Sequence, residues 1–203
     1  MHSLTEPLTD EELAQKAQAG SRRCFEELVD RYSPKLFNFL RPKIASNQDI
    51  EDIIQETFFK LYRNIFRYDS KWKFSTWIYT AAHRMAISFY RSKDKRISKE
   101  LPAFTAADPE DKVIQEVLSQ NIWKKAQSLN PDHYEALWLR YVEDMSSKEI
   151  AKVMKRSQVA VRLLLHRARL NLAKQFQTDP EFEREVSNSV LEGKKIHFEE
   201  NRG

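Results

Sequence analysis

The segment YDSKWKFSTWIYTAAHRMAISFYRSKDKR, Tyr68–Arg96, interleaves aromatic rings with lysines and arginines and holds few acidic residues. Aromatic rings stack on unpaired bases and cations follow the phosphates, so this composition is typical of a surface for single-stranded nucleic acid. From Trp77 onward, apolar residues recur about every four positions, which predicts an amphipathic helix. Ser75 or Thr76 is expected to cap its first turn. The segment therefore predicts a helix preceded by a basic aromatic loop.

The aromatic residues of this segment have two interpretations. The apolar stripe of the helix predicts core positions for Trp77, Met85 and Phe89. Trp72 and Phe74 precede the expected helix, among lysines and in a stretch that suits a loop. For these two residues the sequence leaves base contact and packing equally open.

Composition indicates a helical protein with an anionic partner. The chain has 203 residues, is 32% charged and contains three glycines, which favours helices over long hairpins. A net charge of +4 favours an anionic partner such as nucleic acid. The basic residues concentrate in Tyr68–Arg96 and Met145–Phe176.

One cysteine excludes an internal disulfide, and no signal peptide or long apolar run is apparent, so we expect a cytoplasmic protein without membrane insertion. Nothing in the sequence indicates a catalytic residue, a metal site or a cofactor.

The stretch Asp49–Asn64 predicts a second amphipathic helix, ahead of the basic segment. Its apolar face carries isoleucines, Phe58 and Leu61, and its opposite face is largely acidic. A solvated surface is the ordinary interpretation of such a face. Because the acidic helix adjoins a strongly basic region, we expect one side of this domain to dock a protein and the other to meet nucleic acid.

Composition shifts divide the chain into segments. Residues 97–112 lose the aromatic and basic character and contain two prolines, which is typical of a flexible linker. We therefore expect an all-α protein with two small helical domains, 1–96 and 113–176, joined by that linker. Residues 177–203 form an acidic tail, for which a frayed end and an acidic amphipathic helix over 181–191 are about equally favoured.

The second domain contains a helix-turn-helix pattern. Ser146 and Glu149 form a capping box ahead of one short helix, and Ser157 can cap the next. The second helix has a buried stripe that begins at Val161 and an outer face rich in arginine. Any basic helical hairpin approximates this pattern, but the arginines favour duplex DNA over a solvated face.

Together the two halves resemble a family. The stretches DIEDIIQETFFKLYRN, FSTWIYTAAHRMAISFYR and LNPDHYEALWLRYVEDMSSKEIAKVMKRSQVAVRLLLHRARLNLA are similar to regions 2 and 4 of bacterial RNA polymerase sigma factors of the sigma-70 family, extracytoplasmic-function group. The resemblance runs from about Glu11 to Phe176. It implies a factor that binds core RNA polymerase and promoter DNA and has no enzymatic activity of its own, and it makes an anti-sigma factor a candidate partner.

The resemblance also implies roles for particular residues. The polymerase contacts are expected at Asp49, Asp52, Gln55 and Glu56. The melted minus-ten element is expected to meet Trp72, Lys73, Phe74, Trp77, Arg84 and Arg91. The duplex minus-thirty-five element is expected to meet Ser157, Gln158, Arg162, Leu163, His166 and Arg167.

Some positions depart from the family pattern. Arg84 stands where the family usually has asparagine, and Ser88 where aspartate is frequent. In the recognition helix, Leu163 and Leu164 stand where a small polar residue and an arginine are common. Arginine more readily holds phosphate or guanine than the base edges that asparagine reads, so the resemblance leaves the preferred bases open here.

Two other function classes compete with this interpretation. An autonomous helix-turn-helix regulator would use Met145–Phe176 alone, and would leave the acidic helix and the aromatic segment without a task. An enzyme acting on nucleic acid would need a catalytic cluster, but the histidines lie far apart in sequence and no known catalytic motif is present.

Overall fold

The structure, a computed structural model, describes residues 7–94 and 122–177, and every regular element in these two ranges is helical. The labelled helices are α1 (Asp10–Gln18), α2 (Arg22–Leu40), α3 (Asn47–Arg63), the 3₁₀ turn η1 (Ile65–Arg67), α4 (Phe74–Asp94), α6 (Pro131–Tyr141), α7 (Ser147–Met154) and α8 (Gln158–Gln177). Residues 122–126, ahead of α6, are also helical. The all-α prediction is confirmed. The expected linker, 97–112, and the tail beyond Gln177 lie outside the described residues.

Local capping signals set several helix starts. Thr9 and Glu12 form a capping box at α1, in which the Thr9 amide donates to the Glu12 carboxylate at 2.8 Å. The predicted box of Ser146 and Glu149 starts α7 in the same way. The Ser157 hydroxyl accepts from an amide in the first turn of α8, as expected. These starts follow from residues within one helical turn.

Helix α2 runs through Pro34 without interruption, although the proline cannot donate a backbone hydrogen bond. Tyr32 and Leu36, on either side of it, are both buried in the core. Packing of these neighbours therefore holds the helix together across a residue that disfavours it.

Helix α4 begins earlier than the sequence indicates, and this corrects the prediction of a cap at Ser75 or Thr76. Its first residue is Phe74, whose amide donates to the Glu11 carboxylate of α1 at 2.9 Å. An acidic side chain from another helix thus accepts a hydrogen bond from an amide at the start of α4. Its negative charge also lies at the positive end of the helix dipole, which stabilises the helix. Ser75 and Thr76 are buried inside the helix.

The N-terminal unit, residues 7–94, has an aromatic centre. The Tyr32 ring lies 5.4 Å from Phe74 and the Phe39 ring 4.8 Å from Tyr79, both in edge-on geometry. Each of these four side chains is at most 2% exposed. Burial of each contributes about 1.5–3 kcal/mol, so this cluster anchors α2 to α4. Helix α3 adds the apolar stripe predicted from its sequence, including buried Phe58.

The C-terminal unit, residues 122–177, packs α6 against α7 and α8. Its aromatic centre joins Trp123 to Trp138, whose rings lie 5.2 Å apart. Between α7 and α8, Lys155 adopts the left-handed conformation (φ 52°) and ends α7, which makes the tight turn of a helix-turn-helix.

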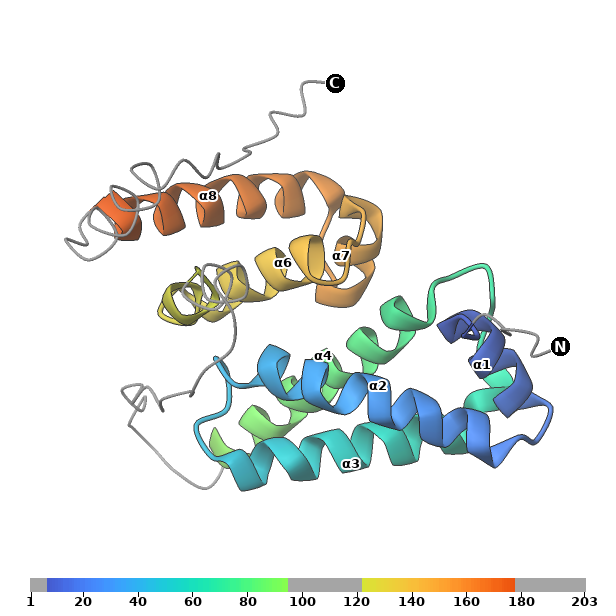
Figure 1. The fold of residues 1–203 in the computed structure, drawn as a ribbon. Helices are drawn as coiled ribbons and strands as arrows, with labels where there is room; N and C mark the ends of the chain where they lie inside the picture. Colours follow the sequence, from blue (N-terminus) through green and yellow to red (C-terminus); the bar gives the residue numbers. More distant parts are fainter. Residues whose placement is uncertain (1–6, 95–121, 178–203) are drawn as a thin grey trace, which may run out of the picture.

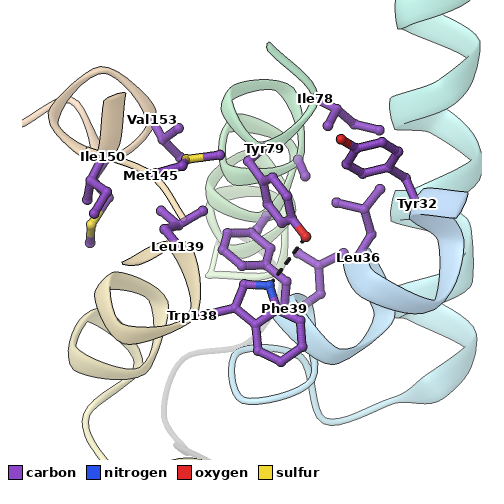
Figure 2. Close-up of a cluster of buried hydrophobic side chains, with 14 of the residues drawn as sticks. Tyr32, Leu36, Phe39, Ile78, Tyr79, Trp138, Leu139, Met145, Ile150 and Val153 are labelled. Atoms are coloured by element: carbon purple, nitrogen blue, oxygen red, sulfur yellow. Dashed lines mark hydrogen bonds between the residues drawn. The ribbon is translucent and has the colours of Figure 1, made fainter. Parts of the chain in front are cut away.

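The two units are docked on each other, a contact that the sequence did not predict. Helices α6 and α7 lie between α8 and the N-terminal unit (Figure 1), and the main contact joins α4 to α7. Buried apolar side chains of both units form one continuous cluster. Figure 2 shows its centre, where the Trp138 indole donates to the Tyr79 hydroxyl at 3.3 Å.

Candidate polymerase and DNA interfaces

The acidic face of α3 is open to solvent. Asp52, Gln55 and Glu56 are exposed, while Asp49 is half-buried and its amide is capped by Ser46 at 3.3 Å. These residues lie on one side of a helix whose other side is core. A docking partner with basic side chains would therefore meet three accessible polar groups held on a rigid element.

A shallow hollow adjoins this face between α2 and α3. It is lined by Ser33, Pro34, Phe37, Asn38, Glu51, Ile54 and Gln55. Since Gln55 borders it, the hollow and the acidic face form one continuous surface. A mixed apolar and acidic surface of this kind suits a protein partner better than DNA.

Exposed aromatic residues follow the acidic part of α3 and continue into η1, and sequence reasoning missed them. Phe59 is 55% exposed and Phe66 is 67% exposed, each with a guanidinium over its ring, from Arg63 and Arg67 respectively. The available signal was the pair Phe58-Phe59, because an amphipathic helix can bury only one of two adjacent rings. Exposed rings of this size mark a contact surface.

Several residues predicted to meet single-stranded DNA are accessible. Lys73, Arg84 and Arg91 are exposed, and Trp72 is half-buried in the loop before α4. Lys152 of α7 places its ammonium 3.4 Å from the centre of the Trp72 ring, and Lys148 lies at 5.4 Å. The loop between α3 and α4 is thus in direct contact with the C-terminal unit.

The structure decides between packing and base contact for Phe74. Its ring is fully buried and lies 5.8 Å from Tyr68 and 5.9 Å from Trp77. Phe74 is therefore a core residue, and its assignment to the DNA surface is corrected. The cause is the early start of α4, which turns this position inward. Trp77 is half-buried against the core, as its place on the apolar stripe predicted.

The polar face of α4 is partly covered by the C-terminal unit. Thr80 and His83, two polar residues of α4, are only 8% and 6% exposed. The His83 ring contacts the Glu135 carboxylate of α6 with Nδ1 at 2.6 Å from Oε1. This part of the face therefore holds another helix of the same chain, while Arg84 beside it stays exposed.

Charged groups are buried where the units meet. Glu135 is fully buried and pairs with both Lys43 and His83. Burial alone would raise the pKa of Glu135, but these two neighbours more than offset it and hold the pKa below its usual range. Glu135 is thus a carboxylate kept ionised by its partners.

A second buried carboxylate behaves in the opposite way. Glu143 is 9% exposed, accepts a hydrogen bond from Tyr79 at 2.9 Å and lies 3.6 Å from the Lys35 ammonium. Burial raises its pKa, and Lys35 and Tyr79 offset this only in part. Within the described ranges, every buried side-chain nitrogen or oxygen has a hydrogen-bond partner, so the interface satisfies the groups that it buries.

The outer face of α8 presents the residues predicted to read duplex DNA. Its exposed positions include the predicted Ser157, Gln158, Arg162, Leu163, His166 and Arg167. Leu164 instead packs against the core, which explains why an arginine is absent there. Val159, 73% exposed, was not predicted and shares this face with Leu163. The surface combines guanidinium groups with apolar side chains, the pair of features that read guanine edges and thymine methyl groups.

Comparison with known proteins agrees with this arrangement. Residues 28–96 match sigma-70 region 2, and residues 119–172 match sigma-70 region 4. The chain is 32% identical over 181 residues to the ECF RNA polymerase sigma-E factor of Escherichia coli (strain K12), covering 82% of this chain and 93% of the relative. It is 28% identical over 175 residues to the ECF RNA polymerase sigma factor BldN of Streptomyces coelicolor, covering 83% of this chain and 66% of BldN.

Two solved structures share the fold. CnrH, solved in complex with the cytosolic domain of CnrY, matches with a TM-score of 0.60 at 24% identity, over 84% of this chain and 98% of that one. The sigma factor RpoE of Bartonella quintana, solved with the anti-sigma factor NepR, matches with a TM-score of 0.60 at 19% identity, over 76% and 98%.

The chain therefore belongs to the extracytoplasmic-function group of sigma-70 RNA polymerase sigma factors. Members of this family direct core RNA polymerase to promoters and are initiation factors rather than enzymes. Both family regions occur here in the family order, and this favours a sigma factor over an autonomous helix-turn-helix regulator. In the two ranges that the structure describes, no helix is both long and apolar enough to cross a membrane.

Proposed function

We propose that this sigma factor divides promoter recognition among three surfaces. The first is the acidic face of α3, which binds core RNA polymerase through Asp52, Gln55 and Glu56, with Asp49 at its edge. The exposed Phe59 ring and the hollow beside Gln55 extend this contact. Charged side chains around an apolar centre are the usual composition of a protein interface, which supports this assignment.

The second surface binds the unpaired strand of the minus-ten element. Trp72 supplies the stacking ring, with a partial contribution from Trp77, and Lys73, Arg84 and Arg91 supply positive charge for the phosphates. Phe74 supports this surface from below, because its buried ring contacts Trp77. Arg84 favours a guanine or a phosphate at its position.

The third surface is the outer face of α8, which reads the minus-thirty-five element in the major groove. Arg162 and Arg167 are exposed on the second helix of a helix-turn-helix, the geometry in which such a helix enters the groove. Leu163 and Val159 lie on the same exposed face and suit thymine methyl groups. This exposed face is the observation that carries the proposal.

The division into domains follows the same surfaces. Residues 1–96 hold the polymerase and minus-ten surfaces, residues 113–176 hold the minus-thirty-five surface, and 97–112 connect them. The proposed factor has no catalytic activity of its own and acts in the cytoplasm, with core polymerase as its obligate partner. An anti-sigma factor is a further candidate partner, in keeping with the RpoE complex named above.

In vitro transcription tests the proposal directly. Core polymerase with this protein, on a library of genomic fragments, should give discrete start sites that share two sequence elements. Permanganate footprinting of such a promoter should show unpaired thymines only when core polymerase and the protein are both present. Melting by the protein alone, or transcription without shared elements, would contradict the proposal.

A further inference from the structure

We propose that α7 occupies the base-stacking surface of the N-terminal unit, so that the docked protein masks Trp72 until the two units separate. The inference rests on the proposed role of Trp72 in binding the unpaired strand. It adds a regulatory contact within the chain: α7 and single-stranded DNA compete for the same ring.

The contact at Trp72 is specific to α7. Lys152 lies 3.4 Å from the ring centre and Lys148 lies at 5.4 Å, both within the range of a cation–π interaction. An ammonium this close leaves no room for a base on that ring face. Burial lowers the pKa of Lys152, in agreement with a lysine that is partly withdrawn from water.

The same helix also contacts α4 beside the single-strand surface. Thr76 of α4 donates to the Glu149 carboxylate of α7 at 3.3 Å. The pKa of Glu149 is lowered: burial raises it, but hydrogen bonds from Ser146 and the charge of Lys73 outweigh burial. Lys73, proposed to hold a phosphate, therefore lies within electrostatic range of the Glu149 carboxylate of α7. In the docked state α7 supplies negative charge to a lysine that DNA would otherwise engage.

Buried contacts on α6 hold α7 in this position. Glu135 joins α6 to Lys43 and His83 of the N-terminal unit, and Trp138 donates to Tyr79 (Figure 2). The Tyr134 hydroxyl donates to the Asn38 carbonyl at 3.1 Å. These bonds lie away from Trp72, so they fix the units without themselves contacting the proposed DNA surface. By contrast, the predicted duplex-reading face of α8 stays exposed, on the far side of α6 and α7 (Figure 1).

The test compares two double variants of the full chain with equal loss of charge. Lys148→Ala/Lys152→Ala removes the cover over Trp72, and Lys16→Ala/Lys124→Ala removes two exposed lysines that have no proposed role. The measurement is affinity for a short, mixed-sequence single-stranded DNA by fluorescence anisotropy. Masking predicts that the first variant binds about fivefold tighter than the second, the low end for one added stacking contact.

Net charge alone predicts equal binding by the two variants, because each has lost two lysines, and the loss of lysines beside the proposed DNA surface would weaken binding further. Equal or weaker binding by Lys148→Ala/Lys152→Ala would therefore overturn the proposal. Adding Trp72→Ala to that variant should abolish the gain. A gain that persists without Trp72 would also overturn it, since the uncovered surface would then lie elsewhere. Circular dichroism melts of each variant check that the fold is retained.

Discussion

Two buried carboxylates at the contact between the units should respond in opposite ways to the same change. Glu135 is fully buried and paired with Lys43 and His83, whose side chains are only 9% and 8% exposed. Glu135→Gln keeps the size of the side chain but removes the negative charge between two donors. Removing one partner of a buried pair costs about 3–5 kcal/mol. Glutamine fills the same space and can still accept a hydrogen bond through its amide oxygen, so we expect the lower end of this range, about 3 kcal/mol.

That loss should be large enough to measure by thermal or chemical unfolding. For a protein of this size each kcal/mol lowers Tm by about 2–4 °C, so Glu135→Gln should lower it by roughly 6–12 °C near pH 7. The pKa of Glu135 is lowered on folding, so its ionised form stabilises the fold above the unfolded pKa of about 4.3. This stabilisation is lost as the pH falls through the lower, folded pKa. The difference between Glu135→Gln and the unmodified protein should therefore shrink below about pH 4.

Glu143→Gln is the matched control in the same interface. The pKa of Glu143 is raised on folding, so its contribution is present below the unfolded pKa and lost as the pH rises through the folded one. Glutamine imitates the protonated acid and still accepts from the Tyr79 hydroxyl. We therefore expect no loss of stability at pH 7, and a gain of up to about 1 kcal/mol.

Urea unfolding followed by circular dichroism, at pH values from 7 down to about 3, compares the three proteins. Equal destabilisation by Glu135→Gln and Glu143→Gln at pH 7 would refute the reasoning, because both residues are buried glutamates and only their partners differ. A loss for Glu135→Gln that does not change with pH would show that packing, and not charge, causes it.

Other predictions concern the proposed surfaces. Reversing charge with Asp52→Lys and Glu56→Lys should weaken binding to core polymerase in gel filtration and leave the far-ultraviolet spectrum unchanged; unchanged binding would place the contact elsewhere. Arg162→Ala or Arg167→Ala should cost about 1–3 kcal/mol on a matched upstream duplex and less on a scrambled one, whereas equal losses on both would indicate phosphate contact alone. Truncation after Gln177 should raise DNA affinity, most at low salt, if the acidic tail competes with DNA for the basic surface; equal affinity at every salt concentration would exclude this competition.

The parts of the fold that the sequence predicted correctly depend on neighbours in the chain. The capping box of Ser146 and Glu149 needs residues three positions apart, and it starts α7 as expected. The alternation of apolar and acidic residues along α3 placed Phe58 inside and Asp52 outside for the same reason. Rules of this range hold because they require no knowledge of what else packs nearby.

The start of α4 lay beyond such rules. Phe74 belongs to α4 because Glu11, far away in sequence, accepts a hydrogen bond from its amide. No sequence pattern around Phe74 predicts that hydrogen bond. The lysines on both sides of Trp72 instead indicated an exposed loop. The error therefore carried through to function, since it assigned a core ring to the DNA surface.

The buried part of the α4 polar face was missed for a related reason. Periodicity separates apolar from polar positions, but it does not say whether a polar face meets water, DNA or another polar face. Here His83 meets Glu135 and Tyr79 meets Glu143, each across more than fifty positions of the chain. A face rich in hydrogen-bonding groups can be buried when another helix brings matching partners.

This ambiguity links the fold to the order in which the proposed DNA surfaces can act. Aromatic rings and polar groups suit the start of α4 and the loop before it to unpaired DNA. The same kinds of group contact α7 here, because Lys152 lies over the Trp72 ring and Thr76 donates to Glu149. The outer face of α8 is not engaged in this way and is exposed while the units are docked. Duplex contact by Arg162 and its neighbours is therefore compatible with the docked state. Stacking on Trp72 is not, so it must follow a step that moves α7 away. Core polymerase is proposed to bind the acidic face of α3, so its binding energy is available to drive that step without competition for Trp72.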